Sequence, residues 1–171
     1  MRLFAAVPLD RRGREAAAVY QTALRQLGIR GNFTRPENLH VTLAFLGEQP
    51  DWRDAAEALE TVEGEPGVLA LDRLDSFPRG GVLYLGSGDD GAVRSLAAAA
   101  ASALSRAGFR LEKRSFKAHV TLCRELRAPE GTSLPPPPAI RVPVRELVLY
   151  WSHRPGGVLT YTPMWSKNLG E

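Results

Sequence analysis

An internal repeat constrains the fold of this chain more than any other feature of its sequence. An apolar run at residues 3–8, an amphipathic stretch after Asp10 and an apolar run at residues 39–46 recur about 79 residues later, at residues 82–85, after Asp90 and at residues 118–123. Short apolar runs between turn residues predict strands, and apolar positions three and four residues apart predict a helix. The order strand, helix, strand therefore occurs twice, which predicts two similar lobes that face each other about a pseudo-two-fold axis.

Each of the two predicted helices has one apolar face and a glycine near its end. The first begins at Asp10 and ends at Gly28, and its inward positions are predicted to be Ala16, Tyr20, Ala23, Leu24 and Leu27. The second ends before Gly108, and its inward positions are predicted to be Val93, Leu96, Ala97, Ala100 and Leu104.

Further elements flank the repeats. Asp51 can cap a short helix with Trp52, Ala55, Leu59 and Val62 inward, and strands are predicted at residues 68–74, 109–113, 140–144, 147–151 and 159–165. The four prolines at 135–138 predict a stiff connector. We expect an α+β fold, bilobal by duplication, with largely antiparallel sheets and outer helices, in which residues 1–171 form a single domain of two intertwined lobes.

Composition gives weaker constraints. Hydrophobic residues make up 44% of the 171 residues and charged residues 24%, which is typical of a globular domain, and the formal net charge of +3 is compatible with an anionic partner. The one cysteine, Cys123, lies in a predicted strand and is expected to be a buried structural thiol. The apolar run from Leu3 to Leu9 is too short for a secretory signal, so we expect a cytoplasmic, soluble protein with no membrane segment and no obligate protein partner, as a monomer.

Two of the three histidines, His40 and His119, begin the same tetrapeptide, His-Val-Thr-Leu, and both copies occupy the same place in the repeat. Side chains alternate between the two faces of a strand, so each histidine shares a face with the threonine two residues later, Thr42 or Thr121. Valine and leucine then anchor the strand on the other face. If the lobes face each other, two imidazoles and two hydroxyls meet in one cleft.

This set of groups suits the cleavage of a phosphodiester. Near neutral pH one imidazole can act as a base while the other acts as an acid, since the ordinary pKa of histidine is about 6.5. Threonine hydroxyls can donate hydrogen bonds to the phosphate oxygens as charge develops on them. A strained cyclic phosphate could be opened in this way without a metal.

The histidines also allow other interpretations. A single histidine on a strand is usually a structural residue, but duplication at matched positions favours a functional role. A zinc site would need three or four ligands, and neither tetrapeptide has a cysteine or carboxylate at ligand spacing, so no metal and no other cofactor is expected. His153 has no threonine beside it and is predicted to be a loop residue.

The chain resembles the 2H phosphoesterase superfamily, which is defined by two His-x-Thr-x motifs, and within it the RNA 2',3'-cyclic phosphodiesterases, formerly called 2'-5' RNA ligases. The resemblance rests on residues 2–6 (RLFAA), 36–43 (PENLHVTL) with 45–47 (FLG), 116–122 (FKAHVTL) with Arg124, 147–150 (LVLY) and 161–163 (YTP). It covers essentially the whole chain.

The resemblance implies a bilobal fold with a central cleft, with His40 as proton donor, His119 as proton acceptor, and Thr42 and Thr121 as phosphate ligands. It also implies that Arg124 contacts phosphate; a surface ion pair is the alternative. Phe45, the equivalent of Arg124 in the first repeat, could stack on a nucleobase or belong to the core.

The expected function is the hydrolysis of RNA 2',3'-cyclic phosphate ends to 2'-phosphomonoesters, and the expected partner is such an RNA or a cyclic nucleotide. The regiochemistry comes from the resemblance. Three alternatives remain open: 2'-5' ligation of tRNA halves, opening of a smaller cyclic nucleotide, and a non-catalytic RNA- or nucleotide-binding module.

Overall fold

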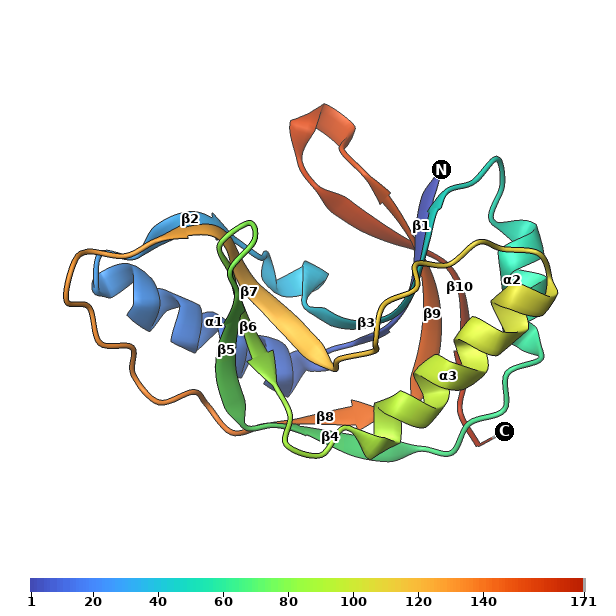
Figure 1. Cartoon of the computed structure of the whole chain (residues 1–171), viewed down its shortest axis with the longest axis horizontal. Coiled ribbons are helices and arrows are strands. Elements are labelled where there is room, and N and C mark those ends of the chain that lie inside the picture. The colour runs from blue at the N-terminus through green and yellow to red at the C-terminus, as the bar shows by residue number, and fades with distance from the viewer. Residues whose placement is uncertain (171) are drawn as a thin grey trace.

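Two four-stranded antiparallel sheets form the frame of the molecule, which the computed structural model describes over residues 1–170 (Figure 1). The first sheet has the order β10–β9–β1–β3, with the bounds β1 Arg2–Pro8, β3 His40–Glu48, β9 Glu146–His153 and β10 Thr160–Asn168. The second has the order β2–β7–β6–β5, with the bounds β2 Arg30–Phe33, β5 Arg73–Phe77, β6 Val82–Gly86 and β7 His119–Arg127. A two-stranded ribbon pairs β4 (Gly67–Leu71) with β8 (Ile140–Val144).

Three α-helices accompany these strands within residues 1–170: α1 (Arg11–Gln26), α2 (Arg53–Glu60) and α3 (Gly91–Arg106). Asp10 caps α1, because its Oδ1 accepts a hydrogen bond of 2.9 Å from the amide of Gly13. Asp51 similarly accepts a bond of 2.8 Å from the amide of Arg53 at the start of α2. Two 3₁₀ turns, η1 (Pro36–Asn38) and η2 (Pro155–Gly157), complete the elements of this part of the chain. None of its helices is long and apolar enough to cross a membrane.

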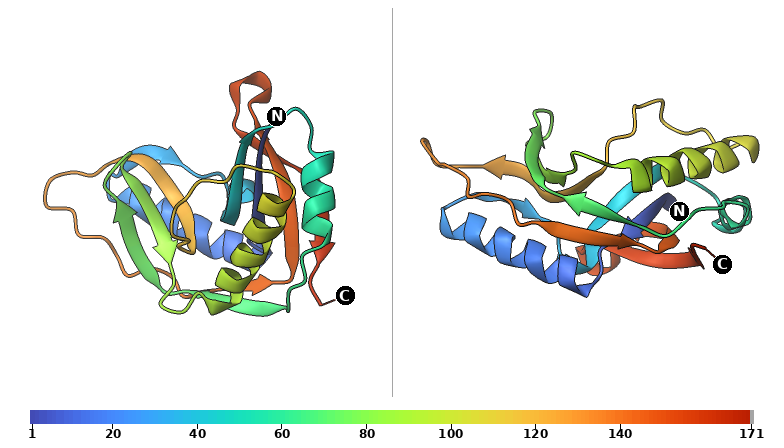
Figure 2. Two further views of the ribbon diagram at one scale, coloured as in Figure 1. Left: turned by 45° about the vertical axis from the view of Figure 1, so that its right-hand side comes forward. Right: turned by 90° about the horizontal axis from the view of Figure 1, so that it is seen from below.

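The two repeats exchange their helices. Strands β1 and β3 are neighbours in the first sheet, yet α1, which connects them, lies against the second sheet (Figures 1 and 2). The side-chain amide of Gln21 on α1 donates to the carbonyl oxygen of Leu122 on β7 at 2.9 Å and to that of Thr34 at 2.8 Å. Helix α3 connects β6 and β7 of the second sheet and contacts β3 of the first. We call the first sheet with α2 and α3 the first lobe, and the second sheet with α1 the second lobe.

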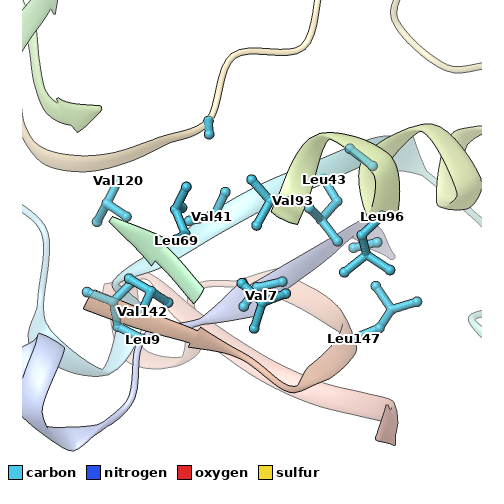
Figure 3. Close-up of a cluster of buried hydrophobic side chains, with 14 of the residues drawn as sticks. Val7, Leu9, Val41, Leu43, Leu69, Val93, Leu96, Val120, Val142 and Leu147 are labelled. Atoms are coloured by element: carbon cyan, nitrogen blue, oxygen red, sulfur yellow. The ribbon is translucent and has the colours of Figure 1, made fainter. Parts of the chain in front are cut away.

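One hydrophobic core joins the two lobes. Val93 and Leu96 of α3 lie beside Leu43 of β3 and Leu147 of β9 (Figure 3). The β4–β8 ribbon contributes apolar side chains to the same cluster, since Leu69, Leu71, Ile140, Val142 and Val144 are all buried. The ribbon also contacts both exchanged helices, β8 touching α1 and β4 touching α3. Burial of this continuous apolar surface holds both histidine-bearing strands in fixed positions.

The α+β class with antiparallel sheets is confirmed, and both repeats fold as strand, helix and strand. The strand predicted at residues 109–113 is wrong, because residues 109–118 are irregular. Phe109, Leu111 and Phe116 pack against the core from this loop, so their alternation with charged residues reflects a loop with one buried side.

Three other expectations need correction. Residues 68–74 form parts of two strands, because the chain turns at Asp72, whose amide bonds to the carbonyl oxygen of Gly86 at 3.0 Å. No strand was predicted where β2 lies, because it pairs with β7 through its backbone while most of its side chains are exposed, so it has no apolar pattern. Leu27 was expected to point inward but is 44% exposed, since the buried side of α1 runs through Ala17, Tyr20, Gln21 and Leu24.

Candidate active site

A cleft of about 1250 Å³ lies between the two sheets and receives side chains from both. His40 and Thr42 on β3 line it from the first lobe, and His119 and Thr121 on β7 line it from the second. The valines that follow the histidines, Val41 and Val120, are fully buried on the opposite faces of their strands. The structure therefore brings the two matched imidazole and hydroxyl pairs to one cavity.

Phe45 and Arg124 also line the cleft, although strict alternation would turn a side chain five residues after a histidine to the other face. The register explains the difference. Between β1 and β3 the pairing skips Leu43, and between β6 and β7 it skips Leu122. The extra residue forms a bulge that leaves two consecutive buried positions in each strand and returns the next side chain to the cleft.

Each imidazole is oriented by the same kind of hydrogen bond. Nδ1 of His40 lies 2.6 Å from the carbonyl oxygen of Asn38, and Nδ1 of His119 lies 2.7 Å from that of Lys117. A carbonyl oxygen only accepts, so each Nδ1 carries the proton and each Nε2 is left as the reactive nitrogen. Nε2 of His40 lies 2.9 Å from Oγ1 of Thr42. In the neutral ring the threonine hydroxyl donates this bond.

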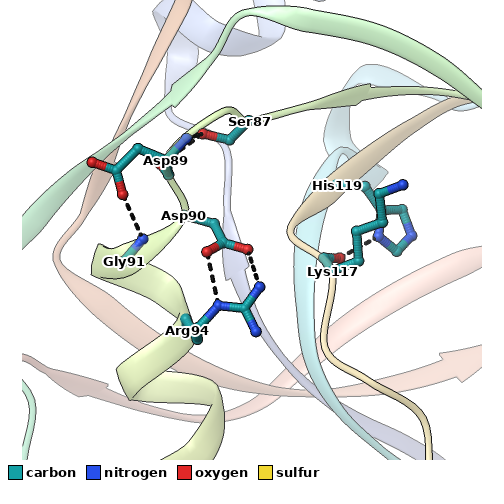
Figure 4. A network of polar contacts seen from close by, with 7 residues as sticks. All are labelled: Ser87, Asp89, Asp90, Gly91, Arg94, Lys117 and His119. Atoms are coloured by element: carbon teal, nitrogen blue, oxygen red, sulfur yellow. Dashed lines mark hydrogen bonds and ion pairs between the residues drawn. The ribbon is translucent and has the colours of Figure 1, made fainter.

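Figure 4 shows the start of α3, where Asp90 binds Arg94, and the bond between the Lys117 carbonyl and His119. Asp90 binds the guanidinium of Arg94 through bonds of 2.9 and 2.8 Å, and it also accepts a hydrogen bond from the amide of Ala118. The Arg94 hydrogen bond, with the help of its charge and of the Ala118 amide, lowers the pKa of Asp90. The Ala118 amide and the Lys117 carbonyl belong to one peptide group. The Asp90 carboxylate therefore helps to position the carbonyl that orients the ring of His119.

Aromatic rings surround both histidines. The ring centroid of His40 lies 4.9 Å from that of Phe4 and 5.2 Å from that of Tyr161. That of His119 lies 5.2 Å from Phe77 and 5.4 Å from Tyr84. These contacts restrict each imidazole to one orientation and remove part of its hydration.

Loss of hydration lowers the pKa of both rings and so favours their neutral forms near neutral pH. Burial lowers the pKa of His40 to about 4 against the opposing effect of the Asn38 hydrogen bond, and the charges of His119 and Arg124 lower it further. Burial also lowers the pKa of His119, again against its backbone hydrogen bond, and the charges of Arg124 and Lys117 act in the same direction. Arg124 lines the same cleft, and its charge lowers the pKa of both rings.

The cleft is strongly basic. Five arginines line it, at positions 2, 25, 35, 124 and 154, against one carboxylate, Glu48. Such a cavity attracts a phosphate-bearing ligand before any specific contact forms. Within residues 1–170 no group of three histidine, cysteine or acidic side chains is placed to hold a metal ion. Cys123 is buried behind Arg124 and burial raises the pKa of its thiol, as expected for a structural residue.

Several cleft residues did not follow from the motifs. Tyr161 and Arg154 reach the cleft from the β9–β10 hairpin, and Phe33 reaches it from β2. Their positions depend on long-range strand pairing, because Phe33 pairs with Cys123 of β7 and β9 pairs with β1. His153 ends β9 at the rim, so the prediction of a loop residue was wrong; its ring stacks on Trp151 at 3.8 Å and its Nε2 lies 2.7 Å from Oγ1 of Thr162.

Comparison with known proteins agrees with this geometry. The sequence profile of the 2'-5' RNA ligase superfamily matches residues 14–156. The chain belongs to this superfamily of 2H phosphoesterases. An RNA 2',3'-cyclic phosphodiesterase of Archaeoglobus fulgidus is 37% identical over 134 residues, which cover 74% of either chain, and one of Escherichia coli is 36% identical over 135 residues, which cover 75% of this chain and 74% of the relative.

Solved structures of the superfamily share the whole fold. E. coli LigT complexed with 3'-AMP superposes with a TM-score of 0.87 at 29% identity and covers 99% of this chain and 98% of its own. TT0787 of Thermus thermophilus gives a TM-score of 0.79, also at 29% identity, with the same coverage. The 2H phosphoesterase topology therefore extends over essentially the full length of this chain.

Proposed function

We propose that this phosphodiester hydrolase opens 2',3'-cyclic phosphates at RNA ends and leaves 2'-phosphomonoesters, with His40 as proton donor and His119 as proton acceptor. Relatives named RNA 2',3'-cyclic phosphodiesterase support the substrate. The single observation that carries the chemistry is that two imidazoles, each with Nδ1 bonded to a backbone carbonyl, line one basic cleft.

In this reaction a water molecule attacks the phosphorus while Nε2 of His119 takes its proton. The bond from phosphorus to the 3'-oxygen breaks, and Nε2–H of His40 gives its proton to that oxygen. Once Nε2 of His40 is protonated, it no longer accepts the hydrogen bond of the Thr42 hydroxyl. The Thr42 hydroxyl is thereby freed to donate to a phosphate oxygen, as Thr121 does from the other side, and Arg124 adds charge.

The residue two positions before each histidine differs between the two motifs. Lys117 stands two residues before His119, whereas the uncharged Asn38 stands at the equivalent place before His40. The ammonium of Lys117 disfavours a proton on His119. A bound phosphate anion favours protonation of both rings. The assignment of His40 as donor and His119 as acceptor is supported by the resemblance of the two motifs to those of the superfamily.

Turnover of a short RNA with a 2',3'-cyclic phosphate tests the proposal. His40→Ala and His119→Ala should each lower kcat by about 10²–10⁴-fold, because each variant removes one proton-transfer group. Arg12→Gln is the control, because it changes an exposed side chain on α1 outside the cleft. We expect activity to persist in EDTA and the product to carry its phosphate on the 2'-oxygen. Full activity of either catalytic-site variant, or a joined RNA in place of a hydrolysed one, would contradict the proposal.

A further inference from the structure

Three polar side chains form a row across the first sheet beyond the histidines. Arg2 on β1 pairs with Ser152 on β9, and Ser152 pairs with Tyr161 on β10. Directly paired residues of neighbouring strands lie on the same face, and all three line the cleft. Arg154 follows immediately after β9 and lines the cleft as well. The row therefore continues the floor of the cleft toward the β9–β10 hairpin.

Three arginines line the cleft together with Tyr161: Arg2, Arg124 and Arg154. Burial raises the pKa of this half-buried tyrosine, while the charges of Arg124, Arg154 and Arg2 lower it, in that order. These arginines come from β7, from the hairpin and from β1, so the fold brings three distant segments to the cleft that Tyr161 lines. The tyrosine is neutral and does not balance these positive charges, so the arginines are suited to bind an anionic ligand.

No carboxylate within residues 1–170 lies within 4.0 Å of these three guanidinium groups. The nearest candidate by register is Glu48, opposite Arg2, but its Oε2 lies 3.4 Å from the amino group of Met1. Arg2 is instead held over the ring of Phe45, 4.8 Å from its centroid, which leaves the N–H edges of the guanidinium available. Of the remaining cleft arginines, Arg35 is paired with the carboxylate of Glu37, and Arg25 lies over the ring of Phe33.

This cluster adjoins the catalytic groups. The ring of Tyr161 meets that of His40 edge to face at 5.2 Å. Arg124 lines the same cleft, and its charge lowers the pKa of both histidines and of Tyr161. Because the ring of Tyr161 contacts that of His40, a ligand phosphate at the tyrosine would lie close to the phosphate at the histidines, as two phosphates of one nucleotide do.

We infer that Arg2, Arg154, Ser152 and the Tyr161 hydroxyl form a second phosphate subsite, which binds the phosphate on the 5'-oxygen of the terminal nucleotide. The inference rests on the proposed function for the identity of the ligand. The 5'-phosphate has two sources, the internucleotide linkage of an RNA strand and a free 5'-monophosphate, which share the same chemistry. Arginine and hydroxyl donors are the groups that bind such oxygens.

Binding measurements test the subsite without any turnover, so they remain informative even if the proposed reaction fails. Calorimetry compares adenosine 2'-phosphate, adenosine 2',5'-bisphosphate and a diadenosine ligand that carries one internucleotide linkage and a terminal 2'-phosphate. We expect the additional phosphate to tighten binding roughly tenfold, the size of one or two hydrogen bonds to a charged group. A gain with the dinucleotide alone would identify the internucleotide linkage as the source, and a gain with the bisphosphate alone would identify the free monophosphate.

Variants assign this gain to the subsite. The gain is the ratio of the affinity for a ligand with the additional phosphate to the affinity for adenosine 2'-phosphate. In Arg2→Gln and Arg154→Gln this ratio should fall to within about twofold of unity. Tyr161→Phe keeps the ring but removes the hydroxyl, so it should lose part of the gain. Arg12→Gln is the matched control, because it removes the same charge from an exposed site on α1 outside the cleft and should keep the wild-type ratio. Equal affinity of the wild type for all three ligands, or an unchanged ratio in both arginine variants, would overturn the inference.

Discussion

His40 and His119 sit in the same local setting, a half-buried imidazole between two aromatic rings with Nδ1 bonded to a carbonyl two residues earlier. Loss of hydration keeps both rings neutral until an anion arrives. The charge needed for catalysis is therefore brought by the substrate, and two measurable consequences follow at this scale.

The first consequence concerns stability in acid. The pKa of His40 falls from 6.5 to about 4 on folding, so between these pH values the unfolded chain binds a proton that the native protein does not bind. The free energy of unfolding therefore decreases as the pH is lowered through this range. Solvent reaches part of the ring, so we expect about 1 kcal/mol from His40.

Urea denaturation at pH 7 and pH 4.5 measures this contribution. His40→Gln should lose less stability between the two pH values than the wild type, and His119→Gln should change in the same direction because the pKa of His119 is also lowered. A variant that loses as much stability as the wild type would show that the ring does not titrate as described.

The second consequence is that phosphate binding should take up protons. A dianion between the two rings favours the imidazolium form, so the pKa values of the pair rise on binding. Calorimetric titration with inorganic phosphate at pH 6.5, in buffers of different ionisation enthalpy, should give an uptake of up to about one proton beyond that of phosphate itself. The His40→Ala, His119→Ala double variant should show none of the excess.

The sequence predicted the residues of this site that occur in a repeated pattern. His40, Thr42, His119 and Thr121 were found because they recur at one offset, and all four line the cleft. Tyr161 and Arg154 occur in no repeat, and they reach the cleft only because β9 pairs with β1, which lies far away in sequence. Single-sequence patterns do not contain that pairing.

At the scale of the strand, one inserted residue in β3 and one in β7 determine which side chains face the substrate. The equivalence of Phe45 and Arg124 was predicted from the repeat, but alternation alone would have turned both away from the cleft. Strand β2 was not predicted, because it has no apolar alternation and is held by its backbone pairing with the bulged part of β7.

A glycine in β2 makes this pairing possible, which gives a prediction about stability. Gly31 has a φ of 151°, and a Cβ at this position would lie 2.7 Å from the carbonyl oxygen of Arg124 and 2.7 Å from Sγ of Cys123. Gly31→Ala must move β2 away from β7, so we expect a loss of about 2–3 kcal/mol in the free energy of unfolding.

Gly47→Ala is the matched control for this experiment. Gly47 has a φ of 70°, but no atom lies within 4 Å of the position that an alanine methyl group would take, so only the left-handed backbone should cost energy, about 1 kcal/mol. Chemical denaturation of both variants makes the comparison. An equal loss in the two proteins would show that the contact with β7 is not tight.

At the scale of the whole molecule, the duplication was visible in the sequence but the exchange of helices was not. The apolar face of α1 indicates that the helix packs on a sheet, and nothing in its residues specifies which one. The side-chain amide of Gln21 binds β7, which indicates that α1 packs on the sheet of the second lobe. A buried glutamine within an apolar face gave no recognisable signal by itself.

The exchange predicts that the two lobes unfold together. All three tryptophans, Trp52, Trp151 and Trp165, lie in or beside elements of the first lobe, whereas Leu24 on α1 is buried against the second. Leu24→Ala should cost about 2–5 kcal/mol. Because the core is continuous, the urea midpoint from tryptophan fluorescence should fall as far as the midpoint from circular dichroism. A fluorescence midpoint that stays at the wild-type value would show independent lobes.

The same exchange bears on what a fragment of this protein can do. A chain cut between α2 and β4 would leave the first piece with α1 but without β6 and β7, and the second piece with α3 but without β1 and β3. Each piece would then expose an apolar helix that only the other piece can cover. Separately expressed halves would therefore be active only after they are mixed and associate with each other.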